Sequence, residues 1–266
     1  MTLHRLLMRT AKEIIEAIEE FAPLSNQEGW DNSGLQVGDP EILVDSALVG
    51  LDPTYELICE ARDKGIKLVI THHPLIFKGI KRITGDDPTG RCIIEAIRNG
   101  IVIYSTHTAS DKVLEGVSGA AAKMLGLQDL SVLECDKDPH VGLGVVGNLP
   151  YPMKDEEFIK YVKQCLDVKN VRTSRPVGKE ISKVAFCGGS GGSLIGSAIE
   201  AGADAYISGD IKYHDFFTGD ALLIVDPGHF ETEAQIMKVF VEVVKKKFPN
   251  FAVLIGEQIH NPVYYY

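Results

Sequence analysis

The sequence predicts an α/β fold built from two α/β units, with mostly parallel or mixed sheets flanked by helices. Three observations indicate this class. Short apolar segments alternate with helical segments from about residue 46 to residue 125, the alternation loosens between Gly126 and Glu180, and it returns from Lys183 onward. Strands that alternate with helices are typical of βαβ units and of largely parallel sheets.

The first unit opens with a predicted helix near Thr10. Thr10 and Glu13 form a capping-box pattern, Ile14 and Ile18 lie on the same helix face, and Pro23 ends the helix. A polar loop follows over residues 29–34 and contains the only tryptophan.

The alternating segments of the first unit follow this loop. Asp52 is the predicted N-cap of the first helix and Pro53 its first helical residue. Predicted strands cover residues 46–51, 67–71 and 101–105. Two predicted helices end at Gly65 and Gly100, and a third covers residues 113–125.

The second unit has a less regular beginning. A strand is predicted over residues 141–149 and an amphipathic helix over residues 155–166. Later predicted strands cover residues 183–187, 205–208, 221–225 and 251–255, and predicted helices cover residues 194–201 and 232–248. We therefore expect one unit over residues 1–126 and another over residues 127–266, although the last strand can pair with either sheet.

Composition limits the classes of partner. The chain has 266 residues with 27 Lys and Arg against 37 Asp and Glu, a net charge of −10, which repels nucleic-acid phosphates. The five cysteines, an odd number without a Cys-x-x-Cys motif, predict reduced and mostly buried thiols. The sequence offers no signal-peptide pattern and no long apolar span, so we expect a cytoplasmic protein that does not enter a membrane.

Polar side chains gather where the predicted strands end. His72 and His73 follow an apolar strand directly. Neighbouring side chains of an extended chain point to opposite faces, so both reach one site only if the chain turns, which Pro74 favours; alternatively, each serves a different ion. In open α/β sheets ligands bind at the carboxyl ends of strands, and imidazoles there are suited to metal binding.

Three further residues match this chemistry. His229 and Glu233 are four residues apart after another apolar strand, so a helix would place them on one face. Both side chains would bind one ion, or the carboxylate would bridge two ions. The alternative is an ordinary surface pair of residues four apart. Asp111 follows the strand at residues 101–105 and is either a ligand or the N-cap of the next helix.

Two other histidines are candidates for proton transfer. His107 lies in the same loop as Asp111, and His214 lies in a polar segment after the strand at residues 205–208. Either could line the site as an acid–base group. His107 could instead support a metal ligand from behind, and the polar residues around His214 could simply cap the next helix.

A glycine-rich segment covers residues 188–193 between a predicted strand and a predicted helix. Backbone N–H groups in such a turn can bind an anion, so Gly189, Ser190 and Gly191 are candidate cofactor-binding or phosphate-binding residues. The segment lacks the Lys-Ser/Thr of a P-loop and does not match Gly-x-Gly-x-x-Gly. The alternative is a tight turn that permits close packing.

Six segments together resemble the dinuclear metal-centre family of GTP cyclohydrolase 1 type 2 homologs, also called Nif-three-like proteins. They occur in the family's order and span nearly the whole chain: residues 30–38 (WDNSGLQVG), 71–74 (THHP), 107–111 (HTASD), 188–191 (GGSG), 208–214 (SGDIKYH) and 228–233 (GHFETE).

The resemblance implies a set of metal ligands and an assembly. The implied ligands are His72, His73, Asp111, His229 and Glu233. It also implies two α/β units that meet at the metal site and a ring-shaped homohexamer. The chain departs from the family where Ala109-Ser110 replaces Asn-Leu before the aspartate. It also lacks room for the domain that longer members insert in the middle.

Two functions of different classes follow. The first is a dinuclear metal-dependent hydrolase that acts on a nucleotide or related small molecule through metal-bound water, with ring opening of GTP as the named case. Two divalent ions can lower the pKa of a bound water and clamp an oxyanion. The second is a non-enzymatic metal-binding scaffold or regulator. Histidine and carboxylate ligands suit zinc, iron or manganese.

Overall fold

The computed structural model describes residues 8–265, and the predicted α/β class is confirmed. The chain forms two compact units. One runs up to Ser110 and resumes at Ile236, and the other spans Asp111–Gln235. This division differs from the expected one at residues 126 and 127, because the helix before residue 126 packs on the sheet of the second unit.

The first unit contains a five-stranded sheet. Its strand order is β13-β4-β5-β6-β2, parallel except for β2. Its elements are β1 (Arg9–Thr10), α1 (Ala11–Phe21), η2 (Leu24–Asn26), β2 (Gly34–Val37), β3 (Leu43–Val44), β4 (Ser46–Gly50), α2 (Tyr55–Asp63), β5 (Leu68–Thr71), α3 (Pro88–Arg98), β6 (Val102–Ser105), α9 (Ile236–Lys247) and β13 (Ala252–Ile255).

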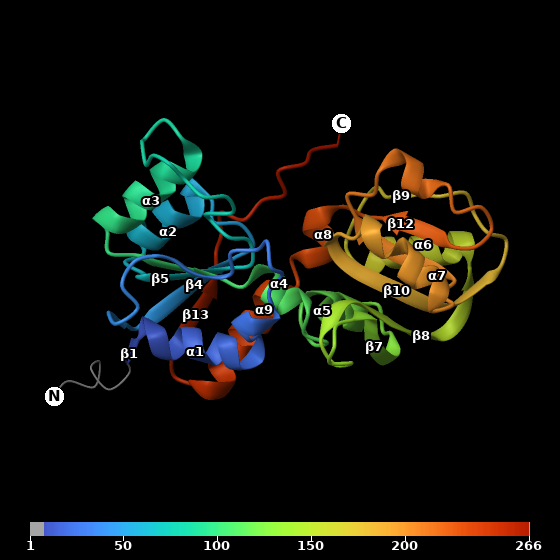
Figure 1. Ribbon diagram of the computed structural model, residues 1–266, viewed down its shortest axis with the longest axis horizontal. Helices are drawn as coiled ribbons and strands as arrows, with labels where there is room; N and C mark the ends of the chain where they lie inside the picture. Colours follow the sequence, from blue (N-terminus) through green and yellow to red (C-terminus); the bar gives the residue numbers. More distant parts are fainter. Residues whose placement is uncertain (1–7, 266) are drawn as a thin grey trace. The chain divides into compact units, whose positions relative to one another are not determined.

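Helices cover both faces of this sheet. Helices α2 and α3 lie on one face and α1 and α9 on the other (Figure 1). Strands β4, β5 and β6 are almost fully buried, as near-continuous apolar strands of a parallel sheet must be. The predicted capping box at Thr10 and Glu13 is present at the start of α1. The last strand, β13, pairs with β4 and so belongs to this sheet.

The second unit contains a six-stranded mixed sheet. Its order is β7-β8-β10-β11-β12-β9, with a parallel centre formed by β10, β11 and β12. Its elements are α5 (Val117–Met124), β7 (Gln128–Cys135), β8 (Gly142–Lys154), α6 (Asp155–Cys165), β9 (Arg172–Thr173), β10 (Glu180–Ser190), η3 (Gly192–Leu194), α7 (Ile195–Glu200), β11 (Ala205–Gly209), η4 (Tyr213–Phe216), β12 (Leu223–Asp226) and α8 (His229–Glu233). A short helix, α4 (His107–Asp111), contains the division between the units.

Strand β10 forms the centre of two cores. Val184 and Phe186 point into a cluster with α5 and α6, whereas Ala185 and Cys187 point into a cluster with α7. This alternation is the two-residue period of a strand. Strand β7, which was not predicted from the sequence, pairs with β8 as an antiparallel edge strand.

Two smaller expectations are corrected. All five cysteines are free thiols, but only Cys92 and Cys187 are buried, and Cys135 is exposed. The helix expected over residues 232–248 is two helices, α8 and α9. Across residues 8–265 we find no helix with the length and apolar character needed to cross a membrane.

Candidate metal centre

His72 and His73 lie at the carboxyl end of β5, where the chain turns. The Thr71 hydroxyl donates to the carbonyl of His73 at 2.8 Å, and the His73 N–H donates to the carbonyl of Leu51 at 2.9 Å. The two imidazole rings lie side by side, with centroids 4.8 Å apart. The turn therefore removes the opposition of faces that a straight strand would impose, and both rings can reach one site.

The Nδ1 atom of each of these rings is held by an oxygen of the first unit. His73 Nδ1 lies 2.7 Å from Asp52 Oδ1, and His72 Nδ1 lies 3.2 Å from Ser110 Oγ. Ser110 stands at one of the departures from the family pattern. Because Nδ1 is held, the Nε2 atoms are the ones available to a metal ion.

The structure corrects the role expected of Asp52. Helix α2 begins later than predicted, and Thr54 is its N-cap, with its hydroxyl accepting from Leu57 N. Asp52 is therefore no helix cap, and its carboxylate is free to orient His73.

His107 is held in the same way by a buried carboxylate. Its Nδ1 lies 2.6 Å from Asp31 Oδ1, and the Asp31 side chain is 0% exposed. Burial by itself would raise the pKa of Asp31, but hydrogen bonds from His107 and Thr108 outweigh it and hold that pKa well below its ordinary value. His107 also has φ of 31°, an uncommon backbone conformation for a side-chain-bearing residue. The position of the His107 ring therefore comes with some local backbone strain.

The second unit positions His229 and Glu233 on α8, after β12. Asp226 stabilises the turn between β12 and α8 because its carboxylate accepts hydrogen bonds from Gly228 N and Ile211 N, each at 3.0 Å. His229 Nε2 lies 3.0 Å from Glu233 Oε2, as expected for an i,i+4 pair. His229 Nδ1 lies 2.8 Å from Asp210 Oδ2, so this imidazole is also oriented by a carboxylate.

The glycine-rich segment lies directly against α8. Residues 188–190 continue β10 instead of forming the expected turn. A Cβ on Gly189 would meet Glu233 Oε1 at 2.2 Å, and one on Gly188 would meet the Val117 side chain at 2.4 Å. A Cβ at either glycine would therefore force a neighbouring side chain to move, and at Gly189 that side chain is Glu233.

The backbone N–H groups of two of the candidate anion-binding residues are used inside the protein. Gly189 N donates to Thr232 Oγ1 and Gly191 N donates to Ser208 Oγ, both at 3.0 Å. The following helix, α7, has six residues. Anion binding by Gly189, Ser190 and Gly191 stays a prediction, and these two donors do not support it.

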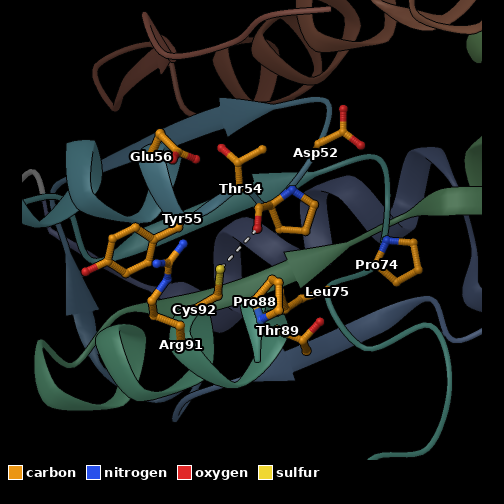
Figure 2. A pocket seen from close by; sticks show the side chains of 11 residues that line it. Asp52, Thr54, Tyr55, Glu56, Pro74, Leu75, Pro88, Thr89, Arg91 and Cys92 are labelled. Atoms are coloured by element: carbon orange, nitrogen blue, oxygen red, sulfur yellow. Dashed lines mark hydrogen bonds between the residues drawn. The ribbon is translucent and has the colours of Figure 1, made fainter. Parts of the chain in front are cut away.

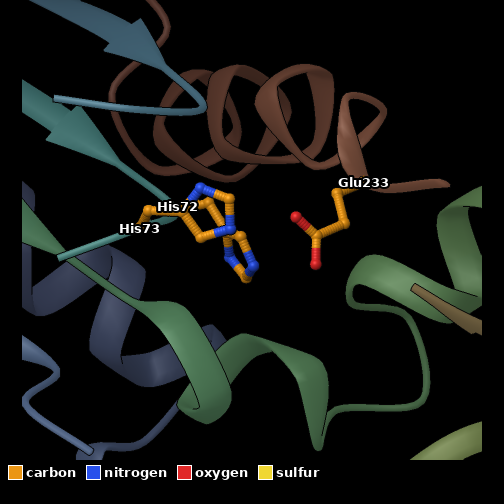
Figure 3. A group of neighbouring side chains, drawn as sticks. All are labelled: His72, His73 and Glu233. Atoms are coloured by element: carbon orange, nitrogen blue, oxygen red, sulfur yellow. The ribbon is translucent and has the colours of Figure 1, made fainter. Parts of the chain in front are cut away.

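Three of the five predicted ligands form a group that could hold a metal ion. His72, His73 and Glu233 each offer one ligand atom, and these atoms lie within 4.8 Å of one another (Figure 3). His72 and Glu233 are buried and His73 is half-buried. Two imidazoles and a carboxylate are a donor set that zinc, iron or manganese accepts.

Asp111 is the last residue of α4 and is half-buried. It does not cap the following helix, α5, whose N-cap is Gly116. The pKa of the Cys187 thiol is raised to about 12, chiefly by burial and also by the nearby carboxylates of Asp111 and Glu233. Both carboxylates thus act on the same thiol within the second unit.

His214 has different surroundings. It is exposed in η4, with its ring 5.2 Å from that of Tyr213 and 6.3 Å from that of Phe217. It does not belong to the group formed by His72, His73 and Glu233. A catalytic role for His214 stays a prediction.

A cavity of about 340 Å³ in the first unit has Asp52 in its wall (Figure 2). Tyr55, Arg91 and Cys92 also line it. The Arg91 guanidinium lies over the Tyr55 ring at 4.3 Å from its centroid, and Cys92 Sγ lies 3.7 Å from the Pro53 carbonyl. Asp52, whose carboxylate orients His73, is therefore also part of the wall of this cavity.

The orienting carboxylates are the functional residues that sequence reasoning missed. The sequence predicts Asp31 in a polar loop, Asp52 as a helix N-cap and Asp210 in a polar segment. A signal existed for Asp52, because β4 and β5 are adjacent parallel strands whose carboxyl ends meet. No comparable signal existed for Asp31, which is distant from His107 in the sequence.

The fold and these side chains define a class: two-unit α/β proteins with a histidine and carboxylate group suited to a metal ion. A family model supplies the family. Duf34/NIF3 (NGG1p interacting factor 3) matches residues 9–262, and the chain belongs to this family.

Relatives and solved structures agree with this assignment. A Clostridium perfringens protein named GTP cyclohydrolase 1 type 2 homolog is 39% identical, covering 88% of this chain and 91% of that protein. The Schizosaccharomyces pombe Protein NIF3 homolog is 30% identical, over 85% and 84%. A Bacillus cereus structure described as related to NIF3 has a TM-score of 0.89 at 26% identity, covering 97% of this chain and 99% of that one. Reduced HcgD from Methanocaldococcus jannaschii has a TM-score of 0.79 at 31% identity, over 94% and 98%.

Proposed function

We propose that this protein is a metal-dependent hydrolase that acts on a nucleotide or a related small molecule. The observation that carries the proposal is the group formed by His72, His73 and Glu233. The name shared by several relatives, GTP cyclohydrolase 1 type 2 homolog, supports a purine nucleotide as the first substrate to test.

The donor chemistry fits a divalent ion. The orientation of the rings of His72, His73 and His229 through Nδ1 is what metal-binding histidines need, because the partner oxygen fixes the tautomer and leaves Nε2 with a lone pair. We propose Asp111 and His229 as the remaining ligands, which would allow a dinuclear centre of zinc, iron or manganese ions. Such ions would supply Lewis acidity and a lowered pKa for bound water.

His107 is the residue we assign to proton transfer. Its ring centroid lies 5.5 Å from that of His72 and 5.7 Å from that of His73, so it adjoins the ligands. Asp31 fixes its Nδ1, which leaves Nε2 to accept or give a proton. His214 is the weaker candidate, because its ring contacts two exposed aromatic side chains instead.

The free thiols of all five cysteines fit a reducing compartment, so we place the activity in the cytoplasm. We further propose the homohexamer that the family resemblance implies. Light scattering should then give a mass about six times the 29.1 kDa of the chain.

Turnover of nucleotides by metal-loaded protein tests the function. The apoprotein is reloaded separately with zinc, iron or manganese and incubated with a panel of nucleotides that includes GTP, and products are separated by chromatography. We expect turnover that requires metal and is lost in His107→Ala, with Lys179→Ala, an exposed substitution in the second unit, as the control. A fully loaded protein that turns over no member of the panel would favour the non-enzymatic scaffold.

A further inference from the structure

The first unit presents two exposed aromatic side chains beside His107. Trp30 is 61% exposed and Phe77 is 45% exposed. Their ring centroids are 5.9 Å apart with an interplanar angle of 67°, an edge-to-face contact between two rings at the surface. Single exposed apolar residues are common, but two large rings in contact at one point form a small apolar surface that needs an explanation.

This pair is directly connected to the proposed reaction site. His107 has its ring centroid 6.1 Å from that of Trp30 and 5.8 Å from that of Phe77. The same ring adjoins His72 and His73. A flat ligand resting on Trp30 and Phe77 would therefore reach the histidines through His107.

Hydrogen bonds hold the two loops together. Asn32 Nδ2 donates to the carbonyl of Ile76 at 2.7 Å, and Ile76 N donates to Gln36 Oε1 at 3.1 Å. Asn32 is two residues after Trp30, and Ile76 immediately precedes Phe77. The spacing of the two rings is thus set before any ligand arrives, which lowers the entropic cost of binding.

The loop after Phe77 adds positive charge. Lys78, Lys81 and Arg82 are all exposed in a chain whose net charge is −10. A local group of cations in an acidic protein attracts anionic ligands to that place.

We propose that Trp30 and Phe77 form a stacking platform for the planar heteroaromatic ring of an anionic substrate, placing that ring beside His107. Aromatic faces bind nucleobases by stacking and tolerate differences between bases. The basic loop would lie close to the phosphate end. The inference rests on the proposed function and names the part of the substrate that the protein holds.

Trp30 is the only tryptophan and so reports on its own face. Its fluorescence is titrated in metal-loaded protein with GTP and, as a probe without a ring, with inorganic triphosphate; free tryptophan corrects for absorption by GTP. We expect saturable quenching by GTP and none by triphosphate. Phe77→Leu should weaken GTP binding roughly tenfold, because stacking is lost while an apolar side chain remains.

Matched variants complete the test. Phe217→Leu, at an exposed aromatic side chain of the second unit, should leave GTP binding unchanged. Trp30→Phe, measured by calorimetry, should retain most of the affinity that Trp30→Ala loses. This binding measurement does not depend on turnover. A protein that is inactive but still shows quenching by GTP and none by triphosphate would contradict the proposed hydrolase activity and support the stacking platform.

Three results would overturn the platform even in an active enzyme. The first is triphosphate competing as well as GTP. The second is unchanged GTP binding in Phe77→Leu. If that variant also changed the oligomeric mass, Trp30 and Phe77 would instead form a surface for assembly with other copies of the chain. The third is loss of binding in Arg91→Ala but not in Trp30→Ala, which would place the substrate in the cavity next to Asp52.

Discussion

The two units position their candidate ligands by different means. In the first unit, His72 and His73 follow a buried strand, and oxygens from other segments fix their rings. In the second unit, His229 and Glu233 lie on a short helix that fits closely against glycines of β10. Hydrogen bonds to oxygens therefore orient the imidazoles of both units, and in the second unit the fit of Glu233 also depends on the absent Cβ of Gly189.

The largest expected effect is loss of metal when a ligand is removed. Glu233→Gln keeps the size of the side chain but removes its charge, and His73→Ala removes an imidazole. Each should strongly reduce bound metal, measured by elemental analysis, while circular dichroism shows the fold retained. Glu200→Gln, an exposed carboxylate at the end of α7, is the control. Unchanged stoichiometry in both ligand variants would refute the assignment.

The next effect concerns the close fit of α8 against a glycine of β10 in the second unit. Gly189→Ala introduces a Cβ that would meet Glu233 Oε1 at 2.2 Å, at a φ of +64°. Gly202→Ala has a similar φ of +70° with nothing within 4 Å of the added Cβ.

Both glycine variants should be destabilised by roughly 1–2 kcal/mol through the positive φ. Only Gly189→Ala should also lose metal affinity, because Glu233 must move. Calorimetric metal titration of both proteins compares them. Equal affinities would mean that Glu233 moves without consequence and that the glycine is not required for the site.

A smaller effect is expected from the carboxylates that orient the histidines. Asp52→Asn and Asp210→Asn keep an acceptor oxygen but remove the charge that holds each imidazole. Loss of such a partner typically costs roughly 10–100-fold in metal affinity or activity. Asp215→Asn, in the second unit, serves as the comparison. If Asp52→Asn lowered metal affinity and Asp210→Asn did not, orienting hydrogen bonds would be needed for metal binding in the first unit alone.

The last effect concerns Asp31 and changes the stability of the first unit instead of its metal binding. Because its folded-state pKa lies below its unfolded value of 3.8, its charged form stabilises the protein above that pH. This contribution is lost as pH falls below 3.8 toward the folded-state pKa. Asp31→Asn should therefore lower the free energy of unfolding at pH 7 by roughly 1.5–3 kcal/mol, as for hydrogen bonds to charged groups.

Urea unfolding of wild-type protein and Asp31→Asn at several pH values checks this. The difference between the two should be constant near neutrality and should shrink below pH 3.8. A difference that grows on acidification would contradict the ionised carboxylate inferred for Asp31.

The features that the sequence predicted are local ones. Apolar runs indicated the central strands, and polar residues just after them indicated His72, His73 and the pair on α8. The edge strand β7 escaped because its half-exposed residues lack a continuous apolar run. Gly188 and Gly189 were assigned to a turn because glycine composition does not distinguish a turn from a strand in close contact with a neighbour.

The orienting contacts could not be predicted in this way. Asp31 and His107 are far apart in the sequence, and only tertiary structure brings their side chains together. Thr54 replaced Asp52 as a helix cap because both are good cap residues, and the choice depends on where the helix starts.

Anomalous diffraction from crystals grown with zinc or manganese tests the central claim most directly. We predict a peak about 2.0–2.2 Å from Nε2 of His72 and His73 and from a carboxylate oxygen of Glu233. A second peak near Asp111 and His229 would establish the dinuclear centre. Density for metal only at other residues, with these three side chains turned away from it, would contradict the account.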